Sequence, residues 1–255
     1  MSKITMITGA TSGIGRACAF RFAAMGHKLI LTGRRLDRLK VLSSELEKMH
    51  NVSVMVLHFD VRDQQATERA INSLPTEWKN VDILVNNAGL ALGLHSVEEG
   101  LLSDWEQMID TNIKGLLYVT RAIAPGMKAR KKGHVINIGS IAGREVYPKG
   151  NVYCATKHAV NALSQGMRID LVPYGIRVTQ ISPGATETEF SEVRFHGDKE
   201  RARGVYKGFK PLSGQDVAEV IAFAASLPDH VCINDLLLMP TAQASATVFQ
   251  KEDTC

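Results

Sequence analysis

The chain has 255 residues, of which 45% are hydrophobic and 22% are charged, and its formal net charge is +4. This composition is that of a globular protein and argues against disorder or a coiled coil. A chain of this length buries enough apolar surface to fold without disulfide bonds.

Several classes of partner are disfavoured by the distribution of residues. Basic residues are scattered and form no aromatic-interleaved stripe, which argues against nucleic acid. The four cysteines form no C-x-x-C pair and the eight histidines no H-E-x-x-H motif, so we expect no metal site and reduced thiols in a cytoplasmic protein. No apolar stretch approaches the length of a membrane-spanning helix, so we expect no membrane partner.

Short β-branched runs alternate with longer amphipathic segments along the whole chain. Strands are predicted over 4–7, 29–31, 52–57, 83–85, 135–138, 176–181 and 233–238. Helices are predicted over 14–25, 36–49, 63–74, 105–127, 151–171 and 217–225.

This alternation predicts an α/β fold, with a doubly wound parallel sheet that is covered by helices on both faces. We expect one domain over residues 1–255. Two stretches interrupt the pattern: a polar segment over about 184–212, here called the lid segment, and a tail over about 239–255. Ligands bind beyond the carboxyl ends of the strands in such sheets, so functional residues are expected there.

A glycine-rich loop joins the first predicted strand to the first helix. Gly9 permits a sharp turn, Gly13 lets the backbone approach a pyrophosphate, and Gly15 lets helix and strand pack closely. An ordinary strand-to-helix turn is the alternative, but the strand–turn–helix context favours a dinucleotide site at the helix N-terminus. The rest of this predicted cofactor loop is Ala10, Thr11, Ser12 and Ile14.

The end of the second predicted strand indicates which nicotinamide cofactor is used. An NAD enzyme usually carries an acidic residue there to hold the ribose 2′-hydroxyl. This chain has Gly33 followed by Arg34 and Arg35. Guanidinium groups match a phosphate, so we predict NADP, the alternative being that both arginines only begin a solvated helix.

The third and fourth strand ends carry further candidate contacts with the cofactor. Asp60 and Val61 are placed to meet the adenine, although Asp60 could instead cap the helix that starts near residue 63. Asn87, Ala88 and Gly89 lie where a cofactor would cross the sheet. Asn87 could contact a ribose, hold a structural turn, or do both.

The candidate chemistry lies on the helix predicted over 151–171. Tyr153 and Lys157 are four residues apart and so share one face. A free tyrosine has a pKa of about 10, and bringing it near neutrality takes about 4 kcal/mol, which the Lys157 cation and an oxidised nicotinamide could supply. Ser140 would orient the substrate and steady its developing charge. Asn112 could hold a water that links Lys157 to solvent.

These motifs together resemble the short-chain dehydrogenase/reductase family. The chain has T-G-x-x-x-G-I-G at 8–15, N-N-A-G at 86–89, Ser140 thirteen residues before Tyr153, Y-x-x-x-K, and P-G at 183–184. The resemblance covers residues 4 to about 240. It implies a Rossmann-type fold of seven parallel strands, usually in a homotetramer, and the helix face around 155–162 is rich enough in small and apolar residues to pack against another subunit.

The same resemblance implies roles for individual residues. Tyr153 would be the general acid and base, Lys157 would bind the nicotinamide ribose and tune Tyr153, and Ser140 would stabilise the substrate. Tyr153 and Lys157 therefore belong to both the catalytic and the cofactor-binding sets. The segment after the sixth strand would pass beside the nicotinamide, with these residues in contact: Pro183, Gly184, Thr186 and Thr188.

Within the family, the chain looks closest to NADP-dependent 3-hydroxy acid dehydrogenases, which act on serine, allo-threonine and related 3-hydroxy acids. The carrying segments are 84–93, 189–195 and 239–243, and the lid segment departs from the pattern at Thr186-Glu187-Thr188. A small carboxylate substrate of the 3-hydroxyisobutyrate type needs a cationic partner. Arg144 and Arg194 are candidates on position alone, and either could instead be a surface arginine.

Two other functions remain possible at this point. The first is reduction of a 3-oxoacyl thioester carried on a protein, by the same chemistry. The second is a redox sensor that binds NADP(H) without turnover, which the fold alone would allow. The combination of Ser140, Tyr153 and Lys157 argues against a sensor, because a binding module does not need those side chains.

The cofactor prediction is tested by the variant Arg34→Asp. The new carboxylate would repel a 2′-phosphate and accept a hydrogen bond from a ribose hydroxyl, so the preference for NADP over NAD should invert. The measurement is the ratio of kcat/KM for the two cofactors. Equal kcat/KM values for NADP and NAD in the unchanged protein would contradict the prediction drawn from Arg34 and Arg35.

Overall fold

Seven parallel strands form the central sheet of the computed structural model, which describes residues 2–252. Their spatial order is β3-β2-β1-β4-β5-β6-β9. The strands are β1 (Ile4–Ile7), β2 (Lys28–Gly33), β3 (Val54–His58), β4 (Ile83–Asn86), β5 (Gly133–Ile138), β6 (Ile176–Pro183) and β9 (Asp235–Leu238). The expected doubly wound sheet is therefore confirmed.

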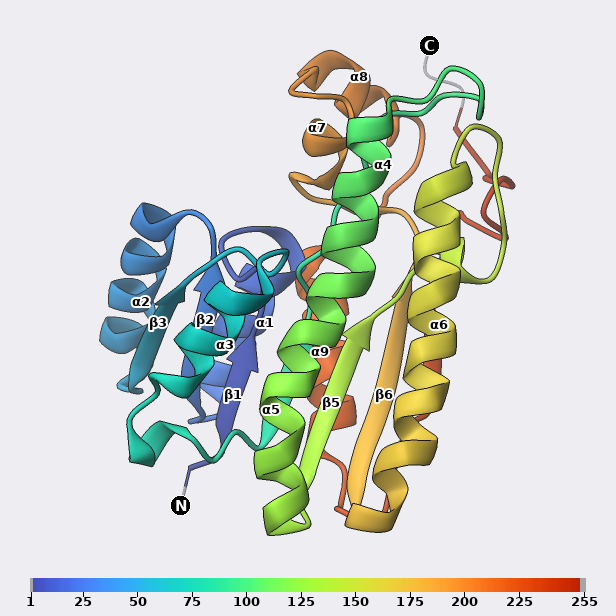
Figure 1. Ribbon diagram of the computed structural model, residues 1–255. Helices are drawn as coiled ribbons and strands as arrows, with labels where there is room; N and C mark the ends of the chain where they lie inside the picture. Colours follow the sequence, from blue (N-terminus) through green and yellow to red (C-terminus); the bar gives the residue numbers. More distant parts are fainter. Residues whose placement is uncertain (1, 253–255) are drawn as a thin grey trace.

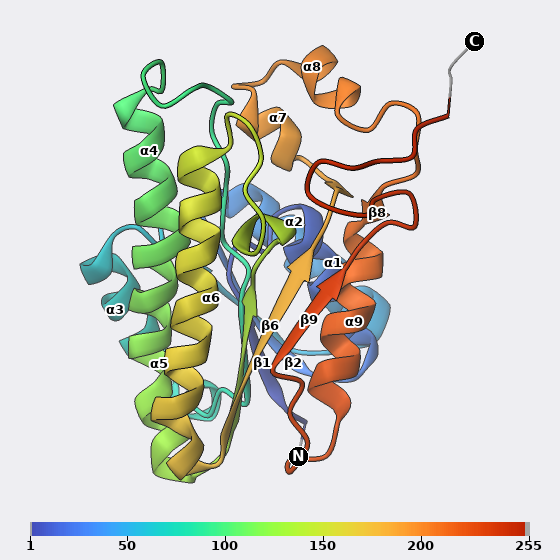
Figure 2. The same ribbon diagram turned by 90° about the vertical axis from the view of Figure 1, so that its right-hand side faces the viewer.

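Helices cover both faces of this sheet (Figures 1 and 2). One face carries α1 (Gly13–Ala24), α2 (Leu36–His50) and α9 (Gly214–Ser226). The other carries α3 (Gln64–Asn72), α5 (Leu116–Arg130) and α6 (Asn151–Leu171), with α4 (Leu102–Ile109) continuing the line of α5. None of the described helices combines the length and apolar character of a membrane span.

Alternation along the strands builds two separate hydrophobic cores. In β1 the side chain of Met6 lies in the core beneath α3 and α5, and that of its neighbour Ile7 lies in the core beneath α1 and α9. Leu84 and Val85 of β4 divide in the same way. Because successive side chains point to opposite faces, strands covered on both faces must be apolar at nearly every position. That is why these strands read as continuous β-branched and aliphatic runs.

The chain reverses its direction of progress across the sheet between β1 and β4. From β1 it moves through β2 to the β3 edge and then returns to pair β4 with β1, where Thr5 aligns with Ile83. At such a switch point the loops after the two neighbouring strands lead away in opposite directions and leave a crevice. The loops after β1 and β4 carry two parts of the predicted cofactor site, residues 9–15 and 87–89.

One predicted helix differs in form. The single helix expected over 105–127 is α4, a π-helical stretch at Asp110–Gly115, and then α5. The side chains of Thr111 and Asn112 are buried at this stretch. A Cβ on Gly115 would lie 2.7 Å from Val61 Cγ2, so the helix passes close to the loop after β3. Such π-helical turns insert an extra residue and are frequent at functional sites.

The lid segment has more regular structure than its sequence indicated. It contains α7 (Phe190–Arg194) and α8 (Lys199–Gly204), and β7 (Thr186–Glu187) pairs in parallel with β8 (Leu212–Ser213). Each element is too short to display a hydrophobic period, so periodicity could not predict it. The tail folds back near this segment, with Gln243 donating and accepting hydrogen bonds and Phe249 packing on Phe209. Residues 253–255 of the expected tail lie outside the described part of the chain.

Two helical glycines provide a matched test of the packing. A Cβ at Gly15 would lie 2.4 Å from the Gly9 carbonyl oxygen, whereas a Cβ at Gly166 in α6 would meet no atom within 4 Å. We expect Gly15→Ala to lower the free energy of unfolding by about 1–3 kcal/mol. Gly166→Ala should raise it by about 0.5–1 kcal/mol, because alanine loses less conformational entropy in a helix. Urea unfolding of both variants measures this, and equal stabilities would contradict the close packing at Gly15.

Candidate active site

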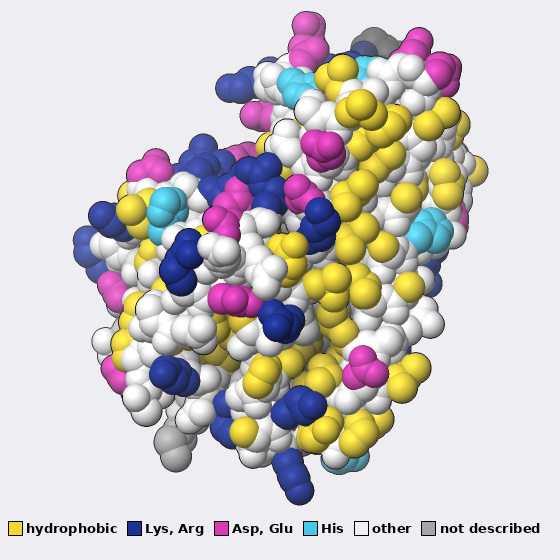
Figure 3. Space-filling model, viewed as in Figure 1, with side chains coloured by type: hydrophobic (Ala, Val, Ile, Leu, Met, Phe, Trp, Pro, Cys, Tyr) yellow, Lys and Arg dark blue, Asp and Glu magenta, His cyan; other side chains and the backbone are white. Residues whose placement is uncertain are grey.

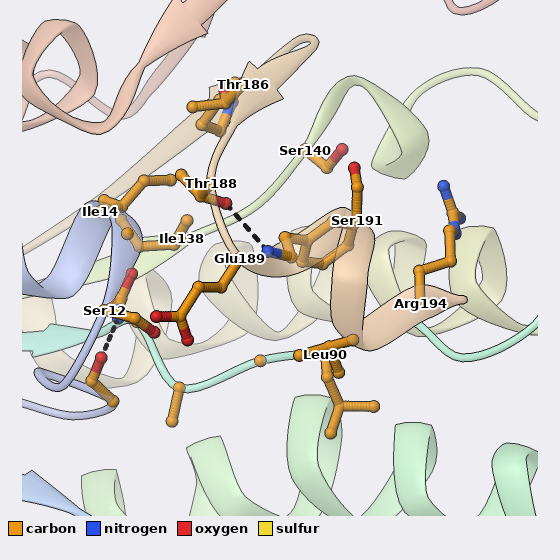
Figure 4. A pocket seen from close by; sticks show the side chains of 18 of the residues that line it. Ser12, Ile14, Leu90, Ile138, Ser140, Thr186, Thr188, Glu189, Ser191 and Arg194 are labelled. Carbon is orange, nitrogen blue, oxygen red and sulfur yellow. Dashed lines mark hydrogen bonds between the residues drawn. The ribbon is translucent and has the colours of Figure 1, made fainter. Parts of the chain in front are cut away.

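A cavity of about 530 Å³ opens beyond the carboxyl ends of β1, β4, β5 and β6. That volume lies within the range usual for small-molecule sites. Its floor is formed by the loops after these strands, and its remaining wall by the lid segment and the tail. The close-up in Figure 4 shows side chains from the glycine-rich loop, from the end of β5 and from the lid segment around one space.

The glycine-rich loop is bonded to the loop after β4. Gly9 has φ +65°, in the left-handed region that favours glycine, and a Cβ there would lie 2.9 Å from Ala88 Cα. The Asn87 side-chain amide donates to the carbonyls of Thr8 (2.9 Å) and Gly9 (3.1 Å). Asn87 therefore holds a structural turn, as one of its two expected roles, and it also lines the cavity.

The N-terminus of α1 is open to the cavity, which it borders with Gly13 and Ile14. The side chain of Ser12 makes no capping hydrogen bond to the helix; its hydroxyl accepts from Arg35 instead (2.9 Å). First-turn amides that no side chain caps can bind an anion such as a pyrophosphate, so this loop fits a dinucleotide. Ala10 and Gly15 are buried behind the loop and do not line the cavity.

The predicted phosphate-binding arginines lie at the outer end of the cavity. Arg35 donates to the Thr11 hydroxyl through Nε (3.0 Å) and Nη2 (2.7 Å). Arg34 is more exposed and its guanidinium lies 3.8 Å from Asp60. Two cations beside an open cleft fit the additional phosphate that distinguishes NADP from NAD.

Asp60 is not the cap of the following helix. Asp63 caps α3 by accepting from the Ala66 amide (2.9 Å), while Asp60 accepts from the Arg62 guanidinium (2.7 and 2.9 Å). Partial burial opposes ionisation, but the hydrogen bonds and charge of Arg62 leave the pKa of Asp60 below its ordinary value. Asp60 and Val61 both line the cavity beside Arg34, where an adenine edge is expected.

Tyr153 and Lys157 lie on one face of α6, and Ser140 lies opposite them at the end of β5. The Lys157 ammonium donates to the Ile138 carbonyl oxygen (2.9 Å) and lies 5.9 Å from the centre of the Tyr153 ring. Both side chains line the cavity although each is less than a tenth exposed. Burial lowers the pKa of Lys157 from its ordinary 10.5 to about 8.

The electrostatics around Tyr153 involve a second cation besides the predicted Lys157. Burial raises the pKa of the phenol well above its ordinary value, and nearby Tyr147 adds to that effect. The groups that oppose the rise are the charge of Arg194 and a hydrogen bond with Ser140. Lys157 donates to a backbone carbonyl while its ammonium stays 5.9 Å from the ring centre. A cation from the lid segment therefore acts on the phenol in addition to Lys157.

Asn112 hydrogen-bonds to two neighbouring parts of the fold. Its carbonyl oxygen accepts from the Leu90 amide (2.9 Å), and its amide nitrogen donates to the Leu90 carbonyl (2.8 Å) and to the Thr156 hydroxyl (3.0 Å). The side chain is buried and does not line the cavity. It joins the π-helical stretch to the loop after β4 and to α6, and so positions the helix that carries Tyr153.

Only one of the two candidate substrate arginines lies at the cavity. The Arg194 guanidinium carbon lies 5.1 Å from the centre of the Tyr153 ring, and Arg194 donates to the Tyr147 hydroxyl. Its Nε is buried and has no hydrogen-bond partner among the described residues. Arg144 instead forms an ion pair with Asp235 and does not line the cavity.

The lid segment supplies residues that sequence reasoning identified and others that it missed. Thr188 packs close to the glycine-rich loop, because a Cβ at Gly13 would lie 3.1 Å from it. Pro183, Gly184 and Thr186 line the cavity as expected. Several lining residues were not predicted as site residues; those with large or charged side chains include Tyr147, Glu189, Phe190, Tyr206, Gln243 and Phe249.

Comparison with known proteins agrees with this architecture. Residues 3–199 match the short chain dehydrogenase family. The chain is 48% identical over 244 residues to the NADP-dependent 3-hydroxy acid dehydrogenase YdfG of Salmonella typhi, covering 95% of this chain and 97% of the relative. It is 44% identical over 252 residues to the NADP-dependent 3-hydroxy acid dehydrogenase of Schizosaccharomyces pombe, covering 98% and 97%.

A solved structure shares the fold closely. The closed form of a serine dehydrogenase complexed with NADP+ superposes with a TM-score of 0.91 at 48% identity, covering 98% of this chain and all of the other. The chain belongs to the short-chain dehydrogenase family.

The burial of Lys157 predicts a pH dependence of stability. Between the folded pKa of about 8 and the ordinary value of 10.5, the unfolded chain binds the extra proton, so the Lys157 contribution to stability rises with pH. From pH 7 to pH 10 the unchanged protein should gain roughly 2 kcal/mol relative to Lys157→Met, which has no such proton. Urea unfolding of both proteins at the two pH values measures this difference. Parallel pH profiles would show that Lys157 is not buried as a cation.

Proposed function

We propose that this chain is an NADP-dependent dehydrogenase of small 3-hydroxy acids, of the serine, allo-threonine or 3-hydroxyisobutyrate type. The observation that carries this proposal is the half-buried Arg194 guanidinium, whose central carbon lies 5.1 Å from the centre of the ring of the predicted catalytic tyrosine. The names of the relatives that match nearly the whole chain support the same class of reaction.

NADP would be held along the cavity from the arginine pair to α6. The amides of the glycine-rich loop would bind its pyrophosphate, Arg34 and Arg35 its 2′-phosphate, and Lys157 its nicotinamide ribose. When bound, this cofactor supplies the hydride acceptor for alcohol oxidation and the hydride donor for ketone reduction.

The proton of the substrate hydroxyl passes to Tyr153. Tyr153 must be a phenolate to accept it, its own proton having been released to solvent, and burial opposes this ionisation. The positive charge of Arg194 and the hydrogen bond of Ser140 favour the phenolate, and so would a positively charged nicotinamide. Ser140 also orients the substrate oxygen at the end of β5, where developing charge can be stabilised.

The carboxylate of the substrate is bound by Arg194. The Arg194 side chain lines the cavity, and a guanidinium is a strong hydrogen-bond donor for a carboxylate in a partly dry site. The Tyr147 hydroxyl, which accepts from Arg194, keeps the guanidinium beside Tyr153. A thioester of a 3-oxo acid has no free carboxylate to use this donor, so the site favours the free acid over the thioester alternative.

A homotetramer in the cytoplasm remains part of the proposal. Exposed hydrophobic side chains gather on the face over α4, α5 and α6 in Figure 3. Among them Leu102 and Ile169 are 68% and 73% exposed. Large apolar side chains on one face support association with another subunit.

The test of the substrate class compares Arg194→Gln with Arg144→Gln. Loss of a charge-assisted hydrogen bond costs about 1.5–3 kcal/mol, so Arg194→Gln should raise KM for L-serine, L-allo-threonine and 3-hydroxyisobutyrate by about 10- to 100-fold. NADP affinity should change little. Arg144→Gln, which removes an arginine outside the cavity, should leave both quantities near those of the unchanged protein.

Reduction of an acetoacetyl thioester with NADPH completes the comparison. If the thioester is the better substrate and Arg194→Gln leaves its kcat/KM intact, the 3-hydroxy acid assignment fails and the thioester alternative replaces it.

A further inference from the structure

Glu189, at the start of α7, extends from the lid segment to the arginines at the outer end of the cofactor cleft. Its two carboxylate oxygens accept from different residues, Oε2 from Arg35 Nη1 (2.8 Å) and Oε1 from Arg38 Nη1 (2.7 Å). In Figure 4 its side chain points towards the glycine-rich loop at Ser12 and away from Arg194. The lid segment thus meets the opposite wall of the cleft through an ion pair.

The contact involves the arginine expected to bind the 2′-phosphate. The other nitrogens of the Arg35 guanidinium donate to the hydroxyls of Thr11 and Ser12, which belong to the glycine-rich loop. Among residues 2–252, Glu189 is the only carboxylate that forms an ion pair with Arg35. A carboxylate therefore occupies the Nη1 side of this guanidinium, while Nε and Nη2 are bonded to the glycine-rich loop.

Glu189 is ionised at neutral pH in this arrangement. Burial opposes the charge, but hydrogen bonds from Arg35 and Arg38, together with their charges, leave the pKa of Glu189 below its ordinary value. The carboxylate and the 2′-phosphate would both be anions, and two anions at one guanidinium repel each other. The Glu189 carboxylate and the 2′-phosphate therefore cannot both form a full ion pair with Arg35.

We propose that Glu189 competes with the 2′-phosphate of NADP(H) for Arg35 and thereby determines how strongly the protein prefers NADP(H) to NAD(H). This inference rests on the proposed assignment of Arg34 and Arg35 to the 2′-phosphate. Arg38 remains available to Glu189 when Arg35 is engaged, because it binds the other carboxylate oxygen. The exchange therefore costs one ion pair between partly exposed groups, which is a modest penalty. Binding of NAD(H) does not break this ion pair, because NAD(H) has a neutral hydroxyl at the 2′ position.

The experiment measures binding rather than turnover. The variant is Glu189→Gln, and the matched control is Glu187→Gln, which removes the same charge from the lid segment at an exposed residue that does not line the cavity. Dissociation constants are measured for NADPH and NADH by fluorescence and for 2′-AMP and 5′-AMP by calorimetry. Glu189→Gln should tighten NADPH and 2′-AMP by about three- to tenfold and leave NADH and 5′-AMP within about twofold. Glu187→Gln should leave all four unchanged.

Two results would overturn the proposal. Weaker binding of NADPH by Glu189→Gln would show that the carboxylate orients Arg35 for the phosphate instead of competing with it. Equal changes for NADPH and NADH would show that Glu189 acts on the cleft as a whole.

A further variant, Arg35→Gln, separates this failure from failure of the site assignment. If Arg35→Gln leaves the preference for NADPH over NADH intact, then Arg35 does not bind the 2′-phosphate and the assignment itself is wrong. If Arg35→Gln removes that preference while Glu189→Gln tightens nothing, only the competition is wrong. Neither outcome depends on which hydroxy acid is the substrate.

Discussion

The site depends on how closely the loops after β1 and β4 approach each other. A Cβ on Gly9 would lie within 2.9 Å of Ala88, so a side chain could not be accommodated there without a shift. The Asn87 amide bonds the two loops together through the carbonyls of Thr8 and Gly9. Because these strands lie side by side at the switch in strand order, their loops form the floor of a crevice instead of closing over it. The cofactor loop and the floor of the cleft take their positions from this junction.

At the inner end of the cleft, two cationic side chains lie near the buried ring of Tyr153. Lys157 and Arg194 both approach the Tyr153 ring; Lys157 is buried and Arg194 is half-buried. Burying a cation costs free energy, which is visible in the pKa of Lys157, lowered to about 8. That cost is recovered when an anion enters the site. A site of this kind is suited to a phenolate and a carboxylate together, which is the chemistry of a hydroxy acid at an alcohol-oxidising centre.

The lid segment connects the two ends of the cleft. Glu189 and Arg194 lie at opposite ends of the single short helix α7, one facing the arginine pair and the other facing Tyr153. The Glu189 carboxylate lies at the end of the cleft proposed for the cofactor phosphate, and the Arg194 guanidinium lies at the end proposed for the substrate. The same short helix therefore faces both ends of the cleft, although the predicted catalytic residues lie just after β5 and on α6.

Local sequence determined the order of strands and helices, the open glycine-rich loop and the identity of the tyrosine, lysine and serine, because each depends on spacing within one element or one turn. The sequence also has Arg34 and Arg35, and no acidic residue, directly after β2. Only the tertiary structure decided which of two arginines faces the cavity, since Arg144 is neutralised by Asp235 from a distant strand. It likewise decided that Asn112 joins three elements and that Glu189 reaches Arg35, which is 154 positions away in the sequence. Contacts between residues so far apart leave no local period or motif, so they emerge only when the sheet brings its loops to one edge.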